Sequence, residues 1–214
     1  MKSMKKILTT ALLLGALASC GGNTTTDETS SNVETPSEQP SDEVSLRELD
    51  AKLVNVAKDK KCYLTTTGQA DLDTVNNLFK LSGTSSLIEK NALLNAADVE
   101  EGAVVFLTLG NSGKGLGAAG IDKASEKTRA EAFAAAAKQG KITLVLFHVG
   151  GIQRRGESDE IIEVAFNGAD ACFITSDGNP DGFFDTLAST NNVDFYPTES
   201  LFDMVDYVKG MFGK

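Results

Sequence analysis

The 214-residue sequence predicts an α/β domain in which helices cover both faces of a parallel β-sheet of about five strands. Strand-like and helix-like segments alternate along the chain, which is typical of β-α-β crossovers. The strongest strand segments, 103–109 (AVVFLTL) and 142–149 (ITLVLFHV), are almost continuously apolar, as strands are when both faces of a sheet are covered. These patterns indicate a three-layer, doubly wound fold of the flavodoxin or Rossmann type.

The first half of the domain contains two predicted strands on either side of a helix. Residues 62–66 form the first strand. Apolar side chains then recur at helical spacing over 72–79, with Asp71 as the expected N-cap and Gly83 just past the helix end. Residues 85–90 carry a weaker strand pattern, and the clear strand at 103–109 follows.

The second half continues the alternation. An Ala-rich helix is predicted over 122–139, with Asp122 near its start and Gly140 near its end. After the strand at 142–149, the predicted elements are a helix over 157–167, a strand over 171–175, a helix over 182–190, a short strand over 194–196 and a final helix with Leu201, Val205, Val208 and Phe212 on one face.

The first 45 residues differ in composition from the domain, which we expect to span 46–214. Residues 1–19 combine an early cluster of lysines with an apolar run too short to cross a bilayer, as in a signal peptide. The run ends in LASC, which resembles a bacterial lipobox, where the cysteine, here Cys20, is acylated; the alternative is an ordinary secretory signal. Residues 20–45 are polar and acidic, which predicts a disordered tether. We therefore expect a palmitate-bearing lipoprotein held at the cell envelope, outside the cytoplasm.

The net charge of the chain bears on which classes of partner the protein binds. Acidic residues outnumber basic ones by 30 to 20, for a net charge of −10. This balance argues against nucleic acid as a partner. We expect membrane contact through the lipid on Cys20, with a membrane protein as a further candidate partner.

Four glycine-rich loops are predicted to follow the strands at one edge of the sheet, where doubly wound folds bind ligands. They cover 65–70, 110–120, 148–156 and 176–182. Glycine allows a close approach to backbone N–H groups, which favours a small polar or anionic ligand. The predicted ligand-binding residues are Thr67, Gln69, Ser112, Gly113, Lys114, Gly115, His148, Gly150, Gly151, Arg154, Arg155, Asp177 and Asn179.

The cationic residues in these loops each leave an alternative open. Lys114 lies in a glycine-rich loop without P-loop spacing, so it is either an anion ligand or a solvated side chain. Arg154 and Arg155 are adjacent and should point apart. Either one of them enters the cleft while the other pairs with Glu157 or Asp159, or both are surface partners of those acids.

His148 and the last loop suggest two further chemistries. His148 is the only histidine, which excludes a multi-histidine metal site; it is either a buried structural residue or the general base of a hydrolase or transferase. Asp177, Asn179 and Asp181 match the opening of a calcium loop, although the usual glutamate at the twelfth position is missing. The alternative is a tight turn in which Asp181 caps the next helix.

The two remaining cysteines, Cys62 and Cys172, fall on predicted strands that would not be neighbours in the usual strand order. Buried free thiols are therefore expected, and an exported protein leaves a disulfide as the alternative.

The motifs GNSGKGLGAAGID, HVGGIQRRGESDE and DGNPDGFF, in this order, resemble an uncharacterised family of bacterial extracytoplasmic proteins and lipoproteins that carries a domain of unknown function. The resemblance covers about residues 62–192 and implies that these three loops are the family signature. It implies no activity. Three functions stay open: a ligand-binding module, an enzyme that uses the same loops, and a surface protein-interaction domain with a flat or filled edge.

Overall fold

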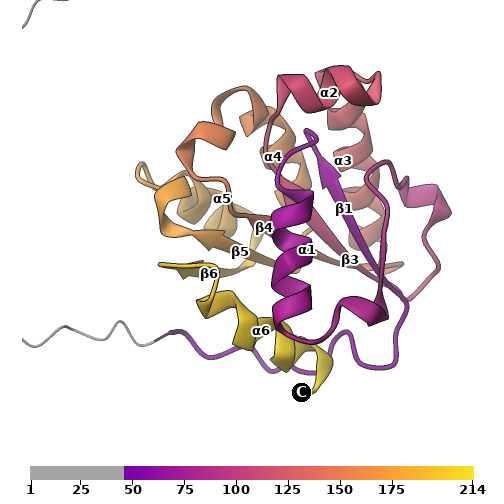
Figure 1. Ribbon diagram of the computed structural model, residues 1–214, viewed down its shortest axis with the longest axis vertical. Coiled ribbons are helices and arrows are strands. Elements are labelled where there is room, and N and C mark those ends of the chain that lie inside the picture. Colours follow the sequence, from indigo (N-terminus) through magenta and orange to yellow (C-terminus); the bar gives the residue numbers. More distant parts are fainter. Residues whose placement is uncertain (1–45) are drawn as a thin grey trace, which may run out of the picture. The chain divides into compact units, whose positions relative to one another are not determined.

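The computed structural model describes residues 46–214, which form a six-stranded sheet between two layers of helices (Figure 1). The expected signal peptide, Cys20 and the tether over 20–45 lie outside the described residues. All neighbouring strands are parallel. The three-layer, doubly wound prediction is confirmed, with six strands where about five were expected.

The strand order is β2-β1-β3-β4-β5-β6. The chain therefore builds outwards from β1 in one direction to β2, and then crosses over to add β3 to β6 on the other side. The direction reverses between β1 and β3, and such a switch point is where doubly wound sheets leave a crevice for ligands. The strands are β1 Cys62–Thr67, β2 Ile88–Lys90, β3 Val104–Leu109, β4 Thr143–His148, β5 Ala171–Thr175 and β6 Asp194–Thr198.

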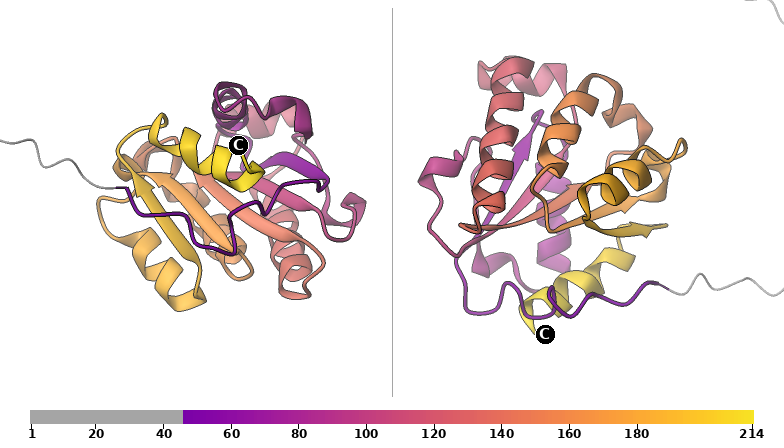
Figure 2. Two further views of the ribbon diagram at one scale, coloured as in Figure 1. Left: turned by 90° about the horizontal axis from the view of Figure 1, so that it is seen from below. Right: turned by 180° about the vertical axis from the view of Figure 1, so that it is seen from behind.

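Helices cover both faces of the sheet (Figure 2). One face packs against α1 (Leu72–Leu81) and α6 (Asp203–Phe212), and the other against α3 (Lys123–Lys138), α4 (Asp159–Phe166) and α5 (Phe183–Asn191). Five 3₁₀ turns join these elements, at Ser85–Leu87, Ala96–Asp98, Ile152–Arg154, Gly156–Ser158 and Ser176–Gly178.

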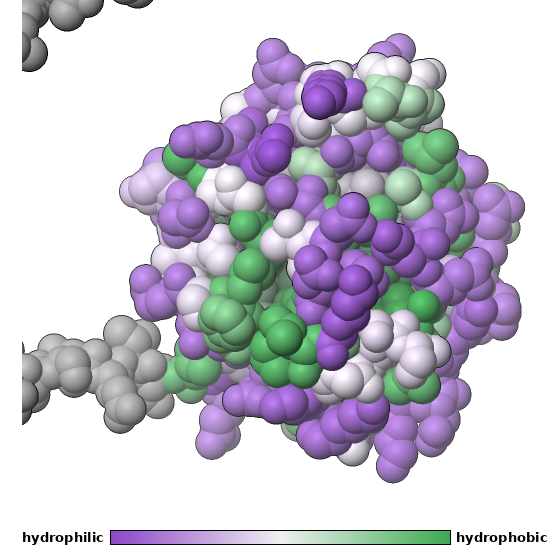
Figure 3. Space-filling view, viewed as in Figure 1, coloured by the Kyte–Doolittle hydropathy of each residue, from purple (hydrophilic) through white to green (hydrophobic). Residues whose placement is uncertain are grey.

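The core under α1 and α6 is rich in stacked aromatic rings. The rings of Phe147 and Phe173 stack at 5.4 Å, and those of Phe173 and Tyr196 at 4.6 Å. Each such buried side chain contributes about 1.5–3 kcal/mol by leaving water. Figure 3 shows further hydrophobic residues at the surface beside α6, where Phe202 is 73% exposed.

One helix start agrees with the sequence-based expectation, and two differ from it. Asp122 lies at the start of α3 as predicted, and it caps the helix, because its carboxylate accepts a hydrogen bond from Ser125 N at 2.8 Å. Asp71 precedes α1 but makes no capping bond, and its backbone is left-handed with a φ of 57°. The glycine-rich loop after β3 contains a short helix, α2 (Gly113–Ala119), which the sequence did not predict because glycine disfavours helices. Ser112 caps that helix through Gly115 N.

The chain enters the domain through an irregular segment, 46–60, that lies along α6 (Figures 1 and 2). Leu53 is 1% exposed, and Asn55 N donates to Gly210 O at 2.9 Å. The segment is therefore part of the folded body. Within residues 46–214, no helix has both the length and the apolar character needed to span a bilayer.

Candidate functional site

The loops after β1, β3 and β4 are joined to one another at the carboxyl edge of the sheet. Ser112 N donates to Gly68 O at 2.9 Å, and Asn111 N donates to Arg154 O at 3.0 Å. Gln69 and Asn111 also form an isolated antiparallel bridge. The fold therefore brings the predicted residues Gln69, Ser112 and Arg154 together at the switch point between β1 and β3.

The glycines of these loops allow the loops to pack on one another. Gly68 has a φ of 84°, and a Cβ there would overlap Gly110 O. A Cβ on Gly150 would overlap both Arg154 and the Oδ2 atom of Asp71. The sequence indicated glycines that leave backbone open to a ligand. In the structure, these positions admit neighbouring loops instead.

Asp71 and Arg154 form the charged centre of this edge. Asp71 Oδ2 lies 3.7 Å from Arg154 Nε, which is an ion-pair distance but too long for a hydrogen bond. Within residues 46–214 this buried oxygen accepts no hydrogen bond. The Asp71 side chain is 13% exposed and that of Arg154 is 43% exposed. Sequence reasoning assigned Asp71 to a helix cap, so it missed this residue.

The backbone around Asp71 is unusual. Gly68, Gln69 and Asp71 all have positive φ angles, of 84°, 56° and 57°. Residues other than glycine rarely adopt this conformation, and such strain accumulates at functional sites. A cavity of about 230 Å³ opens at this turn, and its lining residues are Thr66, Gln69, Ala70, Asp71, Leu72, Asp73 and Thr74.

His148 is buried beneath the edge and does not line the cavity. Its Nδ1 lies 3.0 Å from Leu109 O, and its Nε2 lies 3.1 Å from Gly151 O. Burial lowers the pKa of the imidazole, although both carbonyl contacts act in the opposite direction. Both ring nitrogens face backbone within a fully buried side chain, so the geometry corresponds to the structural alternative and leaves the general-base role without a reachable nitrogen.

Arg155 is the arginine of the adjacent pair that contacts an acid at the start of the next helix, which was one of the two predicted arrangements. Its Nη1 lies 2.6 Å from Asp181 Oδ1, and its Nε and Nη2 each lie 3.2 Å from Asp159. Burial opposes the charge, but these two carboxylates raise the pKa of the guanidinium above its ordinary value. The guanidinium also covers the ring of Phe183 at 4.0 Å. Arg155 thus ties the β4 loop to the β5 loop, and only Arg154 of the arginine pair faces the rim.

Of the three residues of the calcium prediction, Asp177, Asn179 and Asp181, the last two are engaged by partners within the protein. The carboxylate of Asp181 is directed to Arg155 and also accepts from Phe183 N at 3.3 Å. Asn179 Nδ2 donates to Asp185 at 2.6 Å. In the described part of the chain, no group of three or more His, Cys, Asp or Glu side chains could hold a metal ion. Arg155 fastens this turn to the β4 loop.

A family model described as "Domain of unknown function (DUF6305)" matches residues 59–212. The chain belongs to the DUF6305 family. Among curated proteins and among solved structures, nothing matched the chain. The DUF6305 region contains all six strands and the four loops of the carboxyl edge.

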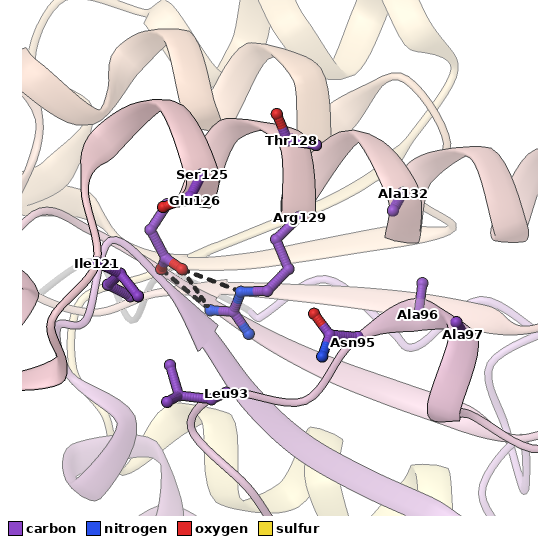
Figure 4. A pocket seen from close by; sticks show the side chains of 10 residues that line it. All are labelled: Leu93, Asn95, Ala96, Ala97, Ile121, Ser125, Glu126, Thr128, Arg129 and Ala132. Atoms are coloured by element: carbon purple, nitrogen blue, oxygen red, sulfur yellow. Dashed lines mark hydrogen bonds and ion pairs between the residues drawn. The ribbon is translucent and has the colours of Figure 1, made fainter.

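A second cavity of the DUF6305 domain, of about 400 Å³, lies between the start of α3 and the connection from β2 to β3 (Figure 4). Its walls are mainly apolar, with Leu93 and Ile121 among them. Glu126 and Arg129 project from α3 and meet at its floor, with Arg129 Nε and Glu126 Oε1 3.0 Å apart.

Glu126 and Arg129, the pair at the floor of the second cavity, form hydrogen bonds with other groups of the protein. Glu126 accepts hydrogen bonds from Gly68 N at 2.6 Å and from the Gln69 amide at 3.2 Å. Arg129 donates to Leu94 O at 2.8 Å and also to Thr66 O. The pair therefore holds the β1 turn in place from below, and it offers no uncommitted charge to a ligand in the larger cavity.

The remaining predicted residues of the DUF6305 domain are spread over the edge. Lys114 and Gly113 are exposed on α2, Thr67 is buried at the end of β1, and Asp177 is exposed beside Gly151. A Cβ on Gly115 would overlap Gln69 O, so this glycine also serves loop packing.

Cys62 and Cys172 are free and buried. Burial raises the pKa of Cys62 to about 11 and that of Cys172 well above its ordinary value. Neither thiol is suited to nucleophilic chemistry.

Proposed function

We propose that this DUF6305 protein is a lipid-anchored protein of the cell envelope whose α/β domain binds a small polar ligand at the carboxyl edge of its sheet. The anchor would be the acylated Cys20, and the ligand site would be the cavity beside Asp71. Support for the anchor comes from the sequence of residues 1–20, and support for the site comes from the geometry of the β1 turn.

The buried oxygen of Asp71 is the observation that carries the ligand proposal. An acceptor that loses water without gaining a donor costs about 1–3 kcal/mol or more. The oxygen belongs to a left-handed residue in a strained turn, at the switch point of the sheet and beside a cavity. Oδ2 itself is closed off from solvent, but the Asp71 side chain is 13% exposed, so a ligand that donates a hydrogen bond to the exposed part of this carboxylate would offset part of the cost.

A ligand that is polar but not simply anionic fits this edge best. Arg155 is neutralised by Asp159 and Asp181, and Asp73 joins Asp71 in lining the cavity. The lining of the cavity thus holds two carboxylates and no cationic side chain, and Arg154 lies beside it, 3.7 Å from Asp71. The enzyme alternative has less support, because His148 is buried with both nitrogens against carbonyls.

Ligand binding is tested by thermal unfolding of the full chain in detergent with small polar molecules: sugars, amino acids, amines and phosphate. A ligand at 100 times its Kd should stabilise the protein by about 2.7 kcal/mol. Asp71→Asn should abolish the shift, because the amide adds a donor where the ligand's donor belongs. Asp98→Asn, an exposed change in the β2–β3 connection, should leave it intact. Equal shifts in both variants, or no shift with any compound, would reject the site.

The anchor is tested separately in a bacterial host. We expect labelled palmitate to enter the wild-type chain, which should sediment with membranes. Cys20→Ser should block labelling and release the protein from the membrane pellet, because several acyl chains are needed for firm anchoring. Cys62→Ser is the matched control. Membrane association that persists without Cys20 would contradict a lipid anchor.

A further inference from the structure

We propose that the ligand at the carboxyl edge is a small zwitterion, of the class of free α-amino acids. The inference rests on the proposed ligand site and specifies its chemistry. Asp71 would accept the ammonium group, and Arg154 would donate to the carboxylate.

The separation of Asp71 and Arg154 is the first argument. The two groups carry opposite charges only 3.7 Å apart, yet they make no hydrogen bond with each other. An α-amino acid carries its ammonium and carboxylate on one carbon atom, so its two charges match a pair of this spacing. Arg154 is 43% exposed and lies next to the cavity rather than in its lining. Its Nη1 donates to Asn111 O at 3.4 Å, which leaves the remaining guanidinium N–H groups to bind a carboxylate.

The charges around the cavity are the second argument. Asp73 pairs with Lys90 at 2.8 Å, and Arg155 is held by Asp159 and Asp181. Among the charged side chains of the β1 turn and the β4 loop, Asp71 and Arg154 therefore have only each other as ionic partners within residues 46–214. An amine without a carboxylate would be attracted by Asp71 but repelled by Arg154. A carboxylate without an ammonium group would be attracted by Arg154 but repelled by Asp71. A zwitterion satisfies both groups at once.

The cavity sets the size of the ligand. Its volume of about 230 Å³ suits an amino acid with a small or medium side chain. Leu72 supplies an apolar wall, while Thr66 and Thr74 supply hydroxyl groups. Thr66 already donates to Ala70 O at 2.9 Å, so within residues 46–214 its hydroxyl has only acceptor capacity left for a ligand.

Calorimetric titration of the full chain with matched compounds tests the inference. Each α-amino acid is compared with the amine that lacks its carboxylate and with the acid that lacks its ammonium. We expect at least one amino acid to bind tenfold or more tightly than both of its analogues. Asp71→Asn should remove the preference over the deaminated acid, and Arg154→Gln should remove the preference over the decarboxylated amine.

Two further variants keep the test decisive if Asp71→Asn folds poorly. Arg154→Lys keeps the charge but loses the fork, so its affinity for the amino acid should lie between those of wild type and Arg154→Gln. Lys209→Gln, which changes an exposed ion pair with Asp206 on α6, should bind as the wild type does.

The outcomes separate this inference from the proposed function. An amine, sugar or other polar compound that binds as tightly as any amino acid, with the same dependence on Asp71, would overturn the zwitterion and leave the ligand site standing. Amino-acid binding that is indifferent to both Arg154 and Asp71 would overturn both proposals. So would the absence of binding by every class of compound.

Discussion

His148 lies beneath the loops that follow β3, β4 and β5. Because its side chain is buried, its protonation state depends on whether the chain is folded. Leu109 O and Gly151 O face its two nitrogens, and Gly178 approaches so closely that a Cβ there would lie 2.7 Å from the ring. The imidazole thus fills a place that connects β3, β4 and the β5 loop. Its role is to position these loops, and its pKa is lowered by burial.

The lowered pKa of His148 predicts a dependence of stability on pH. The unfolded chain binds a proton near pH 6.5, whereas the folded chain binds it only at lower pH. Stability should therefore be complete above pH 6.5 and should fall below it, by up to about 1.4 kcal/mol per pH unit. Urea unfolding at pH 7.5 and pH 5.5 measures this loss, which should be smaller in His148→Gln. Equal losses in the two proteins would contradict the neutral buried histidine.

Gly150 tests whether loop packing positions the charged pair. A Cβ at this position would overlap Arg154 and Asp71 Oδ2, so Gly150→Ala should displace the pair and weaken ligand binding at least tenfold. Gly117→Ala is the matched control, because a Cβ there would meet nothing within 4 Å. Since Gly117 lies inside α2, its replacement should be neutral or stabilise the protein by about 0.5–1 kcal/mol. Unchanged affinity in Gly150→Ala would show that the pair tolerates displacement.

At the scale of elements, α3 does more than cover the sheet. Through Glu126 and Arg129 it holds the β1 turn, the end of β1 and the β2–β3 connection. These two side chains are 2% and 9% exposed. A buried pair with every polar atom satisfied specifies one arrangement of the loops it touches.

Removing one partner of this pair should be costly. Arg129→Met leaves the Glu126 carboxylate buried without its counter-charge, which should lower the free energy of unfolding by about 3–5 kcal/mol. Denaturant titration measures the change. The double variant Glu126→Gln/Arg129→Met should recover part of the loss. Lys209→Met, which breaks the exposed pair with Asp206, should cost less than about 1 kcal/mol. Similar losses in the single buried and single exposed variants would contradict a structural role for the pair.

At the scale of the whole molecule, the segment before the family region is also part of the fold. The DUF6305 match begins at residue 59, but Leu53 is buried against the core that includes α6. Asp50 N also donates to Tyr196 Oη at 2.9 Å. The chain that leads into the domain is therefore attached along α6 rather than at β1 alone.

Neighbouring residues of this segment provide a matched test. Leu53→Ala should lower the free energy of unfolding by about 2–5 kcal/mol, because Leu53 is 1% exposed. Val54 is 46% exposed, so Val54→Ala should change it by no more than about 0.5 kcal/mol. Chemical denaturation of the full chain distinguishes the two. If Leu53→Ala unfolds like Val54→Ala, the segment is not part of the cooperative core.

The layer architecture could be predicted because it depends on local patterns. Continuous apolar runs such as 142–149 correspond to strands covered on both faces, and Asp122 identifies the start of α3 through its own neighbours along the chain. The glycine-rich loops were correctly placed at one edge, because carboxyl ends of parallel strands share that edge. α2 was not predicted, because its glycines disfavour a helix and its formation depends on the Ser112 cap and on packing.

The partners of the edge side chains could not be predicted, because they lie far away in sequence. Asp71 is a plausible helix cap in its local context, and only the approach of the β4 loop turns it towards Arg154. The choice between Arg154 and Arg155 likewise depends on where Asp181 lies after folding. By itself, then, the sequence determined the order of strands and helices and the edge at which their loops meet. Which charges pair with each other at that edge was decided by tertiary structure alone, because burial and long-range pairing depend on how the loops pack together.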